Sequence, residues 1–286
     1  MRQFLAIVGA LLAGTAPLSA QGDCSPDTDS READLFAHFS VPLAFSSAQA
    51  PWIFSPGSIQ IGLEGTLLPD ANDRIATPTT CRPGKGPENV NILAAFPRPR
   101  LAYALMNGVL LEASWTPPIT LKGVKPNLWS FALSRVVPFN RHGALLMGRI
   151  HATIGSITAP FTCPDEALKD PVSECFDGTR SADKYSPNIF GVELGLGFPM
   201  ARGKFRPYFG TGYNILHPRF QVHFRNAIGD LDKRKVDVNL SRIALFGGAT
   251  FAPSRDVMIS GEAYSTPSDQ VTARARVTLL FGGVKR

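Results

Sequence analysis

Apolar and polar residues alternate with a period of two along most of the chain. Residues 97–118 show the pattern clearly, because Asn107-Gly108 separates two stretches in which every second residue is apolar. Asn-Gly accepts the positive φ angles of a two-residue type I′ turn, and a period of two places all apolar side chains on one face of a sheet. The segment therefore predicts a β-hairpin with one apolar and one polar face.

Eight further segments repeat this alternation, which brings the expected number of strands to ten. They are residues 58–68, 128–136, 144–155, 188–198, 204–215, 235–251, 257–265 and 270–281. Long or medium connections (69–97, 117–127, 156–187, 226–234) alternate with short ones, apart from the last, 266–269. Outer-membrane barrels have this pattern, with tight periplasmic turns and longer extracellular loops. The series predicts an all-β, antiparallel, up-and-down transmembrane β-barrel of about ten strands, with both termini in the periplasm.

Residues 31–52, which precede the first strand, fit two patterns. Leu35, Phe36 and Phe39 suit an amphipathic helix, whereas another strand would suit Leu35, Ala37, Phe39, Val41 and Leu43. Eight or twelve strands therefore stay open as alternatives. We divide the chain into a signal peptide (1–20), an N-terminal periplasmic or lumenal segment (21–57) and a transmembrane β-barrel (58–286).

The amino terminus predicts export. Arg2 precedes the apolar run FLAIVGALLAG, and small residues follow at Ser19 and Ala20, which is the order of a secretory signal peptide. The formal net charge is +6, but Lys and Arg are scattered rather than clustered with aromatic residues, so a nucleic-acid partner is not expected.

Four cysteines are expected to form disulfides after export. Cys163 and Cys175 lie in one polar stretch and would close a short local loop, which leaves Cys24 to pair with Cys81. The sequence has no CxxC motif and no histidine at ligand spacing, so neither a metal nor another cofactor is predicted. Asp230 and Asp232 are better explained as a solvated hairpin tip than as a calcium site.

The last strand, residues 270–281, places Arg274 and Arg276 on the face opposite its apolar residues. An Arg facing lipid near the bilayer midplane would cost about 2–4 kcal/mol, so both are expected to point inward. With its alternation up to an aromatic at Phe281, the chain resembles small bacterial outer-membrane β-barrel proteins, although the tail GGVKR extends beyond the aromatic. The resemblance implies a location in the cell outer membrane, with lipid and the barrel-assembly machinery as partners.

Strand parity predicts a charged lumen. The inward set is Arg98, Arg100, Arg149, Arg206, Arg274, Arg276, Glu64, Glu112, Glu193 and Glu262. A ten-stranded barrel is only slightly wider than barrels whose interiors are filled by side chains, so these groups are expected to pair across it. The alternative is a narrow path in which the excess of Arg favours anions. A structural role or a narrow pore for small solutes is the function expected.

Two other classes of function are weighed against this one. A soluble, lipocalin-like periplasmic barrel would hold a small ligand, but it would not require the observed alternation of loop lengths. A lipid A-modifying outer-membrane enzyme would need a His, a hydroxyl and an acidic residue, and His151, Thr153 and Glu193 are the nearest set. Parity places these residues in the lumen, and the chain has no His-x-Ser pair, so no catalytic residue is assigned.

Overall fold

The barrel consists of ten antiparallel strands that close on themselves. The structure is a computed structural model that describes residues 22–282, so the expected signal peptide lies outside the described residues. The strands are β1 (Ile59–Leu67), β2 (Ala95–Met106), β3 (Val109–Thr116), β4 (Lys125–Pro138), β5 (Leu145–Ala159), β7 (Ile189–Gly197), β8 (Phe205–Leu216), β13 (Leu240–Phe251), β14 (Val257–Thr266) and β15 (Gln270–Phe281). Pairing of β1 with both β2 and β15, and of β5 with β7, completes the ring. The predicted all-β fold, an antiparallel up-and-down barrel of about ten strands, is confirmed.

The alternation of the sequence becomes an inside and an outside. Along β15, Val271, Val277 and Leu279 are exposed, whereas Arg274 and Arg276 are buried. This is inverted relative to a water-soluble domain, because the apolar set lies on the outer surface and the charges lie within. The barrel therefore presents an apolar exterior.

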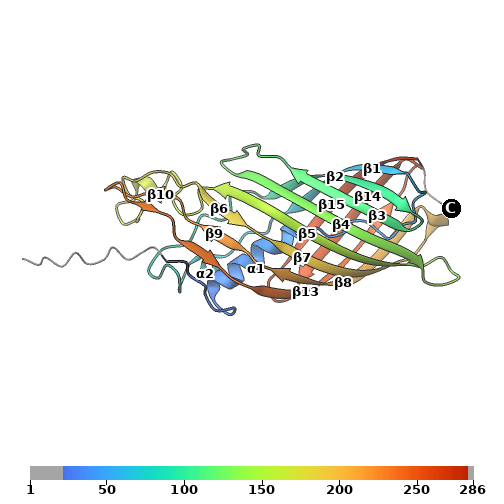
Figure 1. Cartoon of the computed structure of the whole chain (residues 1–286), viewed down its shortest axis with the longest axis horizontal. Coiled ribbons are helices and arrows are strands. Elements are labelled where there is room, and N and C mark those ends of the chain that lie inside the picture. Colours follow the sequence, from blue (N-terminus) through green and yellow to red (C-terminus); the bar gives the residue numbers. More distant parts are fainter. Residues whose placement is uncertain (1–21, 283–286) are drawn as a thin grey trace, which may run out of the picture.

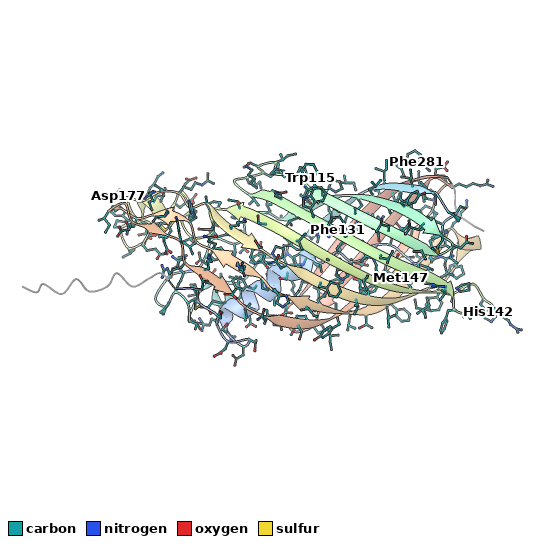
Figure 2. The ribbon with its side chains drawn as sticks, in the orientation of Figure 1. Trp115, Phe131, His142, Met147, Asp177 and Phe281 are labelled. Atoms are coloured by element: carbon teal, nitrogen blue, oxygen red, sulfur yellow. A yellow bond between two sulfur atoms is a disulfide. The ribbon has the colours of Figure 1, made fainter. Side chains whose placement is uncertain are left out.

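Aromatic side chains gather on the outer surface. Trp115, Trp129 and Phe131 stack in a row across β3 and β4, with ring centroids 5.3 and 6.2 Å apart. Trp115 lies toward the long-loop end of the barrel and Phe281 toward the opposite end (Figure 2). Amphipathic rings in such positions match the interface belts of membrane proteins.

The long connections form a cap at one end of the barrel (Figure 1). The cap contains the short strands β6 (Asp183–Ser186), β9 (Arg219–Gln221), β10 (Phe224–Arg225), β11 (Leu231–Asp232) and β12 (Lys235–Asp237), the helix α2 (Asp73–Ala76) and a 3₁₀ turn, Ala167–Lys169. The second 3₁₀ turn, Ala201–Gly203, lies in the connection between β7 and β8. The strand expected over 235–251 is divided: β12 pairs with β9 in the cap, and β13 begins only at Leu240. Pro218 lies opposite this break and has no N–H to continue the ladder.

The N-terminal segment runs through the inside of the barrel. Helix α1 (Arg31–Leu43) begins at Ser30, whose hydroxyl accepts a hydrogen bond from the Ala33 N–H, and residues 44–54 continue in non-helical form. Among the described residues, no helix is long and apolar enough to cross a membrane. The helix is visible within the barrel in Figure 1.

The position of the first described residues differs from expectation. Both termini were expected on the side of the short turns, but Cys24 pairs with Val236 of β12 in the cap, at the long-loop end. The described C-terminal end lies at the opposite end of the barrel (Figure 1). The difference arises because the N-terminal segment descends through the lumen before β1 begins, a path that alternation in the strands does not encode.

Candidate functional site

Strand register brings the inward charges next to one another. Glu64 of β1 lies opposite Arg98 of β2 on one side and Arg276 of β15 on the other. In the same way, Glu262 lies opposite Arg274, and Glu193 lies opposite Arg149. All six arginines and all four glutamates of the sequence-predicted lumen set are buried, at 0–8% exposure.

Ion pairs link most of these side chains into one network. Glu112 is its centre, with Arg100, Arg149 and Arg276 at 3.3, 3.2 and 3.2 Å. Further pairs are Arg98–Glu64 and Arg274–Glu262, both 3.5 Å, Arg149–Glu193, 3.1 Å, and Arg100–Glu64. Carboxylates and guanidiniums buried together stabilise each other only when every charge has a partner. The four glutamates supply fewer negative charges than the six arginines need.

The backbone of the N-terminal segment supplies the remaining acceptors. Every one of the six arginines donates a hydrogen bond to a carbonyl oxygen between residues 41 and 51. The bonds are Arg98 to Leu43 and Ala44 (3.0 and 3.3 Å), Arg100 to Ser46 and Ser47 (2.7 and 3.3 Å), Arg149 to Phe45, Arg206 to Pro51 (3.3 Å), Arg274 to Val41 (2.9 Å) and Arg276 to Ser47 (2.9 Å). We call residues 41–54, which are the last residues of α1 and the non-helical stretch after it, the plug, and these six side chains the arginine clamp.

One aromatic ring sits at the middle of the clamp. Phe45 is fully buried, and the guanidinium carbons of Arg98, Arg100 and Arg149 lie 5.5, 4.1 and 5.0 Å from its ring centroid. Cations over an aromatic face are attracted by its quadrupole, more strongly when water is excluded. Phe45 therefore lets three like charges approach one another in the lumen.

The weakly predicted catalytic set does not form a triad. His151 Nε2 lies 3.6 Å from Glu193 Oε1, while the Thr153 hydroxyl contacts Ser130 Oγ at 3.0 Å and donates to the Leu43 carbonyl. Gly191 lies between His151 and Asn214, where any Cβ would collide with both side chains. Neither ring nitrogen of His151 has a hydrogen-bond partner among the described residues. The arrangement is a tightly packed polar interior in which the hydroxyl and the imidazole do not meet.

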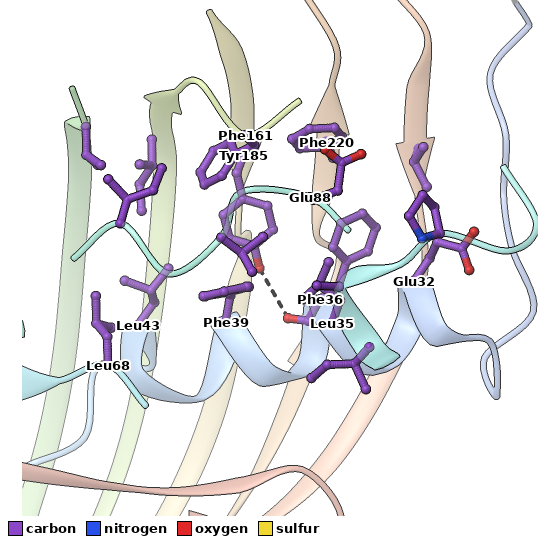
Figure 3. A pocket seen from close by; sticks show the side chains of 18 of the residues that line it. Glu32, Leu35, Phe36, Phe39, Leu43, Leu68, Glu88, Phe161, Tyr185 and Phe220 are labelled. Atoms are coloured by element: carbon purple, nitrogen blue, oxygen red, sulfur yellow. Dashed lines mark hydrogen bonds between the residues drawn. The ribbon is translucent and has the colours of Figure 1, made fainter. Parts of the chain in front are cut away.

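A second feature, the outer cavity, lies above the plug, between α1 and the cap (Figure 3). It has a volume of about 110 Å³. One face of α1 forms its floor, residues 68–96 one wall, and the cap strands the other. Its lining residues are Glu32, Leu35, Phe36, Phe39, Leu43, Leu68, Ile75, Ala76, Pro78, Cys81, Arg82, Glu88, Val90, Ile92, Leu93, Phe96, Val124, Ile157, Phe161, Tyr185, Phe220 and Val236. Most of this surface is aliphatic or aromatic.

Almost all polar groups in the cavity wall form hydrogen bonds or ion pairs within the protein. Glu32 accepts hydrogen bonds from the backbone N–H groups of Thr79, Thr80 and Cys81 at 2.7–3.0 Å. Burial acts to raise the pKa of Glu32, but these N–H groups favour the carboxylate and leave its pKa below the ordinary value. The Tyr185 hydroxyl bonds to Ser40 and donates to the Phe36 carbonyl, the bond drawn in Figure 3.

A charge cluster closes one side of the cavity. Arg82 is 4% exposed and pairs with Glu88 at 3.0 Å and with Glu174, and Lys85 pairs with Glu88. Burial raises the pKa of Glu88, against the opposing effect of Lys85 and Arg82. Arg82 Nε has no hydrogen-bond partner among the described residues. Sequence reasoning missed these residues, because residues 69–97 carry no alternation and their charges look like those of any loop.

Two disulfides hold the cap. Cys24–Cys81 ties the beginning of the N-terminal segment to the loop that walls the cavity, and Cys163–Cys175 closes a short loop between β5 and β6. Nearby, Asp232 forms an ion pair with Arg234. Over residues 22–282, no three His, Cys, Asp or Glu side chains are grouped so as to hold a metal ion.

Comparisons with known proteins give distant likenesses only. No protein-family model and no curated protein sequence matches the chain. Among solved structures, Ail, the attachment invasion locus protein of Yersinia pestis, is 12% identical with a TM-score of 0.31, covering 79% of this chain and 99% of its own. Neisserial surface protein A is 9% identical with a TM-score of 0.30 (79% and 96% covered), and the P. putida toluene transporter TodX is 10% identical with 0.32 (78% and 67% covered). The fold assignment therefore rests on the strand pairing of this chain itself.

Proposed function

We propose that the chain is an outer-membrane barrel for small solutes whose narrow lumen is closed at rest by its own N-terminal plug. The arginine clamp is the observation that carries the proposal. Six charged side chains, from strands all around the barrel, converge on the carbonyls of one short segment. The apolar exterior supports a place in lipid, and the alternating face up to Phe281 supports recognition by the barrel-assembly machinery.

The chemistry of the contact suits a gate. The plug has no charged side chain, and its backbone carbonyls accept hydrogen bonds from the arginine clamp. Water can replace each of these bonds, so the net cost per bond to a charged donor is about 1.5–3 kcal/mol. A permanently filled lumen would be more stable with apolar packing than with buried charges. Displacement of the plug would expose six arginines and four glutamates, and this excess of positive charge favours anions.

Conductance in a planar lipid bilayer tests the proposal. The unmodified protein is expected to show no conductance or small, anion-preferring openings. Phe45→Ala removes three cation–π contacts without changing any charge and should raise the frequency of opening. Phe131→Ala, on the outer surface, is the matched control and should behave like the unmodified protein.

Selectivity supplies the second measurement. Arg274→Glu combined with Arg276→Glu should shift the reversal potential toward cations. Large cation-selective openings in the unmodified protein would refute the proposal, as would Phe45→Ala channels that fold but open no more often than those of the control.

The proposal gives His151 a structural role and assigns no catalysis. It is supported by the absence of contact between the imidazole and the Thr153 hydroxyl, which bonds elsewhere. A hydrolase assay on lipid A with the purified barrel is expected to show no turnover.

A further inference from the structure

A row of basic and polar side chains crosses five neighbouring strands at the long-loop end of the barrel. The strands β4, β5, β6 and β9 lie side by side in Figure 1, and β12 pairs with β9. Their register places five residues directly opposite one another, in the order Lys125, Thr158, Lys184, Gln221 and Lys235. We call these residues the basic row. Its lysines are far apart in the sequence, and only the fold brings them into one line.

The basic row lies on the outer face of these strands. Tyr185, next to Lys184 on β6, lines the outer cavity, and successive side chains of a strand point to opposite faces. Lys184 therefore points outward, and it is exposed. Lys125 shares the exposed face of β4 with Trp129. The other three members of the row each adjoin a cavity-lining residue, so they too face outward.

The height of the row along the barrel axis favours lipid headgroups over acyl chains. Lys125 is four residues from Trp129 toward the long-loop end of β4, which is about 13 Å along the strand. Strands of outer-membrane barrels tilt by about 35–45°, so the separation along the axis is about 10 Å. Trp129 stacks on Trp115 in the aromatic row that matches a membrane interface. Lys125 is thus expected just outside the apolar layer.

Two lysines of the row carry uncompensated charge. Lys125 and Lys184 form no ion pair with any residue between 22 and 282, whereas Lys235 pairs with Asp23 at 3.9 Å. Both unpaired ammonium groups belong to the outward face, next to the surface that contacts lipid. An anion from outside the chain is the partner that they lack.

This excess charge is confined to one side of the barrel. At the same end of β1, β2 and β15, the exposed residues are Leu67, Ala95 and Val271, which are uncharged. In the row next to the basic row, Arg219 of β9 lies opposite Asp237 of β12, so these two charges balance. The positive charge therefore marks a local site rather than a general property of the rim.

The spacing of the two lysines defines the ligand. One strand, β5, separates them, and neighbouring strands lie about 4.8 Å apart, so their backbones are about 10 Å apart. A lysine ammonium binds phosphate as a point charge, and the Thr158 hydroxyl between the two lysines adds a donor. We propose that the basic row binds the headgroup of a lipid with two phosphate groups, one at Lys125 and one at Lys184. This inference rests on the proposed function for the place of the barrel in lipid.

Native mass spectrometry of the mature protein in detergent micelles, titrated with lipid A, tests the inference. Lipid A carries two phosphates, and its monophosphoryl form keeps the acyl chains but has one phosphate fewer. We expect lipid A to bind roughly three- to fivefold more tightly than the monophosphoryl form, which loses one exposed lysine–phosphate contact. Equal affinity for the two lipids would overturn the proposal, and this comparison needs no variant.

A double charge reversal locates the site. Lys125→Glu with Lys184→Glu should weaken lipid A binding roughly tenfold, because two contacts are lost. Lys204→Glu with Arg255→Glu makes the same change of charge at exposed positions near the short turns, and it should bind like the unmodified protein. A heat-dependent gel shift confirms that both variants form the barrel. Equal loss of binding in the two variants would refute the assignment to the basic row.

Competition separates a lipid from other phosphate or polyanion ligands. Millimolar inorganic phosphate should leave lipid A bound, and heparin should bind more weakly than lipid A. Displacement by phosphate, or heparin binding as tight as that of lipid A and lost in the Lys125→Glu, Lys184→Glu variant, would overturn the proposal. Because bilayer conductance does not enter these measurements, failure of the gate would leave them unaffected.

Discussion

Each buried arginine of the lumen has five N–H donors to satisfy and no means of losing its charge. The four glutamates cannot serve six such groups, and the plug carbonyls supply the missing acceptors. Parity along the strands predicts that these side chains face inward, because an Arg facing lipid is costly. It cannot predict their carbonyl partners, because every residue has a backbone carbonyl oxygen, so the sequence does not distinguish the carbonyls that accept these bonds.

The hydrogen bonds that the Glu32 carboxylate accepts can be tested by lowering the pH. Its carboxylate holds the backbone of Thr79, Thr80 and Cys81, and its folded pKa lies below the ordinary value of 4.5. A depressed pKa contributes stability that is present above the unfolded value and is lost as pH falls through the folded value. Hydrogen exchange at these three amides, corrected for the intrinsic rate, should lose protection in acid. Glu32→Gln should show reduced protection at neutral pH and no such acid step; an unchanged acid step in that variant would argue against the assignment.

At the scale of elements, the alternation of the strands predicts the barrel but not its contents. A period of two fixes which face of each strand meets lipid, and ten repetitions make the closed sheet recognisable. Residues 31–52 fit a helix and a strand equally from their apolar positions, and the helix forms where Ser30 caps it inside the barrel. The outer cavity was missed because its walls come from α1, an irregular loop and three short strands that meet only in the folded chain.

The Cys24–Cys81 disulfide is expected to hold the N-terminal segment, including α1, in place, and removing the bridge tests this. It closes a loop of 57 residues, and in the chain-entropy model this should stabilise the folded chain by about 4 kcal/mol relative to the unfolded one. Cys24→Ser with Cys81→Ser should increase hydrogen exchange in residues 22–43 while the barrel strands keep their protection. Cys163→Ser with Cys175→Ser, a bridge over 12 residues, is the control and should loosen only residues 160–182. Uniform loosening of the barrel by either pair would contradict this separation.

At the scale of the whole molecule, the two ends of the barrel are chemically different. The cap, the disulfides and the outer cavity are at one end, and the short turns, apart from the one between β14 and β15, are at the other. Asp177 and His142 mark these opposite ends in Figure 2. Long loops of outer-membrane barrels face the exterior, so under the proposed function we expect the outer cavity to face the medium and the short turns to face the periplasm.

Cysteine labelling in intact cells checks this orientation and the path of the N-terminal segment together. A membrane-impermeant maleimide should label Asp29→Cys, an exposed position at the beginning of the segment, without permeabilisation. His142→Cys, in a short turn, should be labelled only after the outer membrane is opened. Labelling of His142→Cys alone in intact cells would show that the barrel is inverted.

The N-terminal segment runs through the barrel and is attached at both ends, which bears on the order in which the protein is assembled. The N-terminal segment is bonded to the cap loop at its beginning, through Cys24 and Cys81, and it leads through α1 and the plug to β1. In the proposed orientation the cap faces the cell exterior, and an exported chain meets the oxidising periplasm before it enters the outer membrane. If the bridge forms in the periplasm, we expect it to precede translocation of the cap, and we expect the seam between β1 and β15 to close around a segment already in place. On this expectation the plug is in place before the barrel closes, and a barrel that has already closed would not acquire its plug by later insertion.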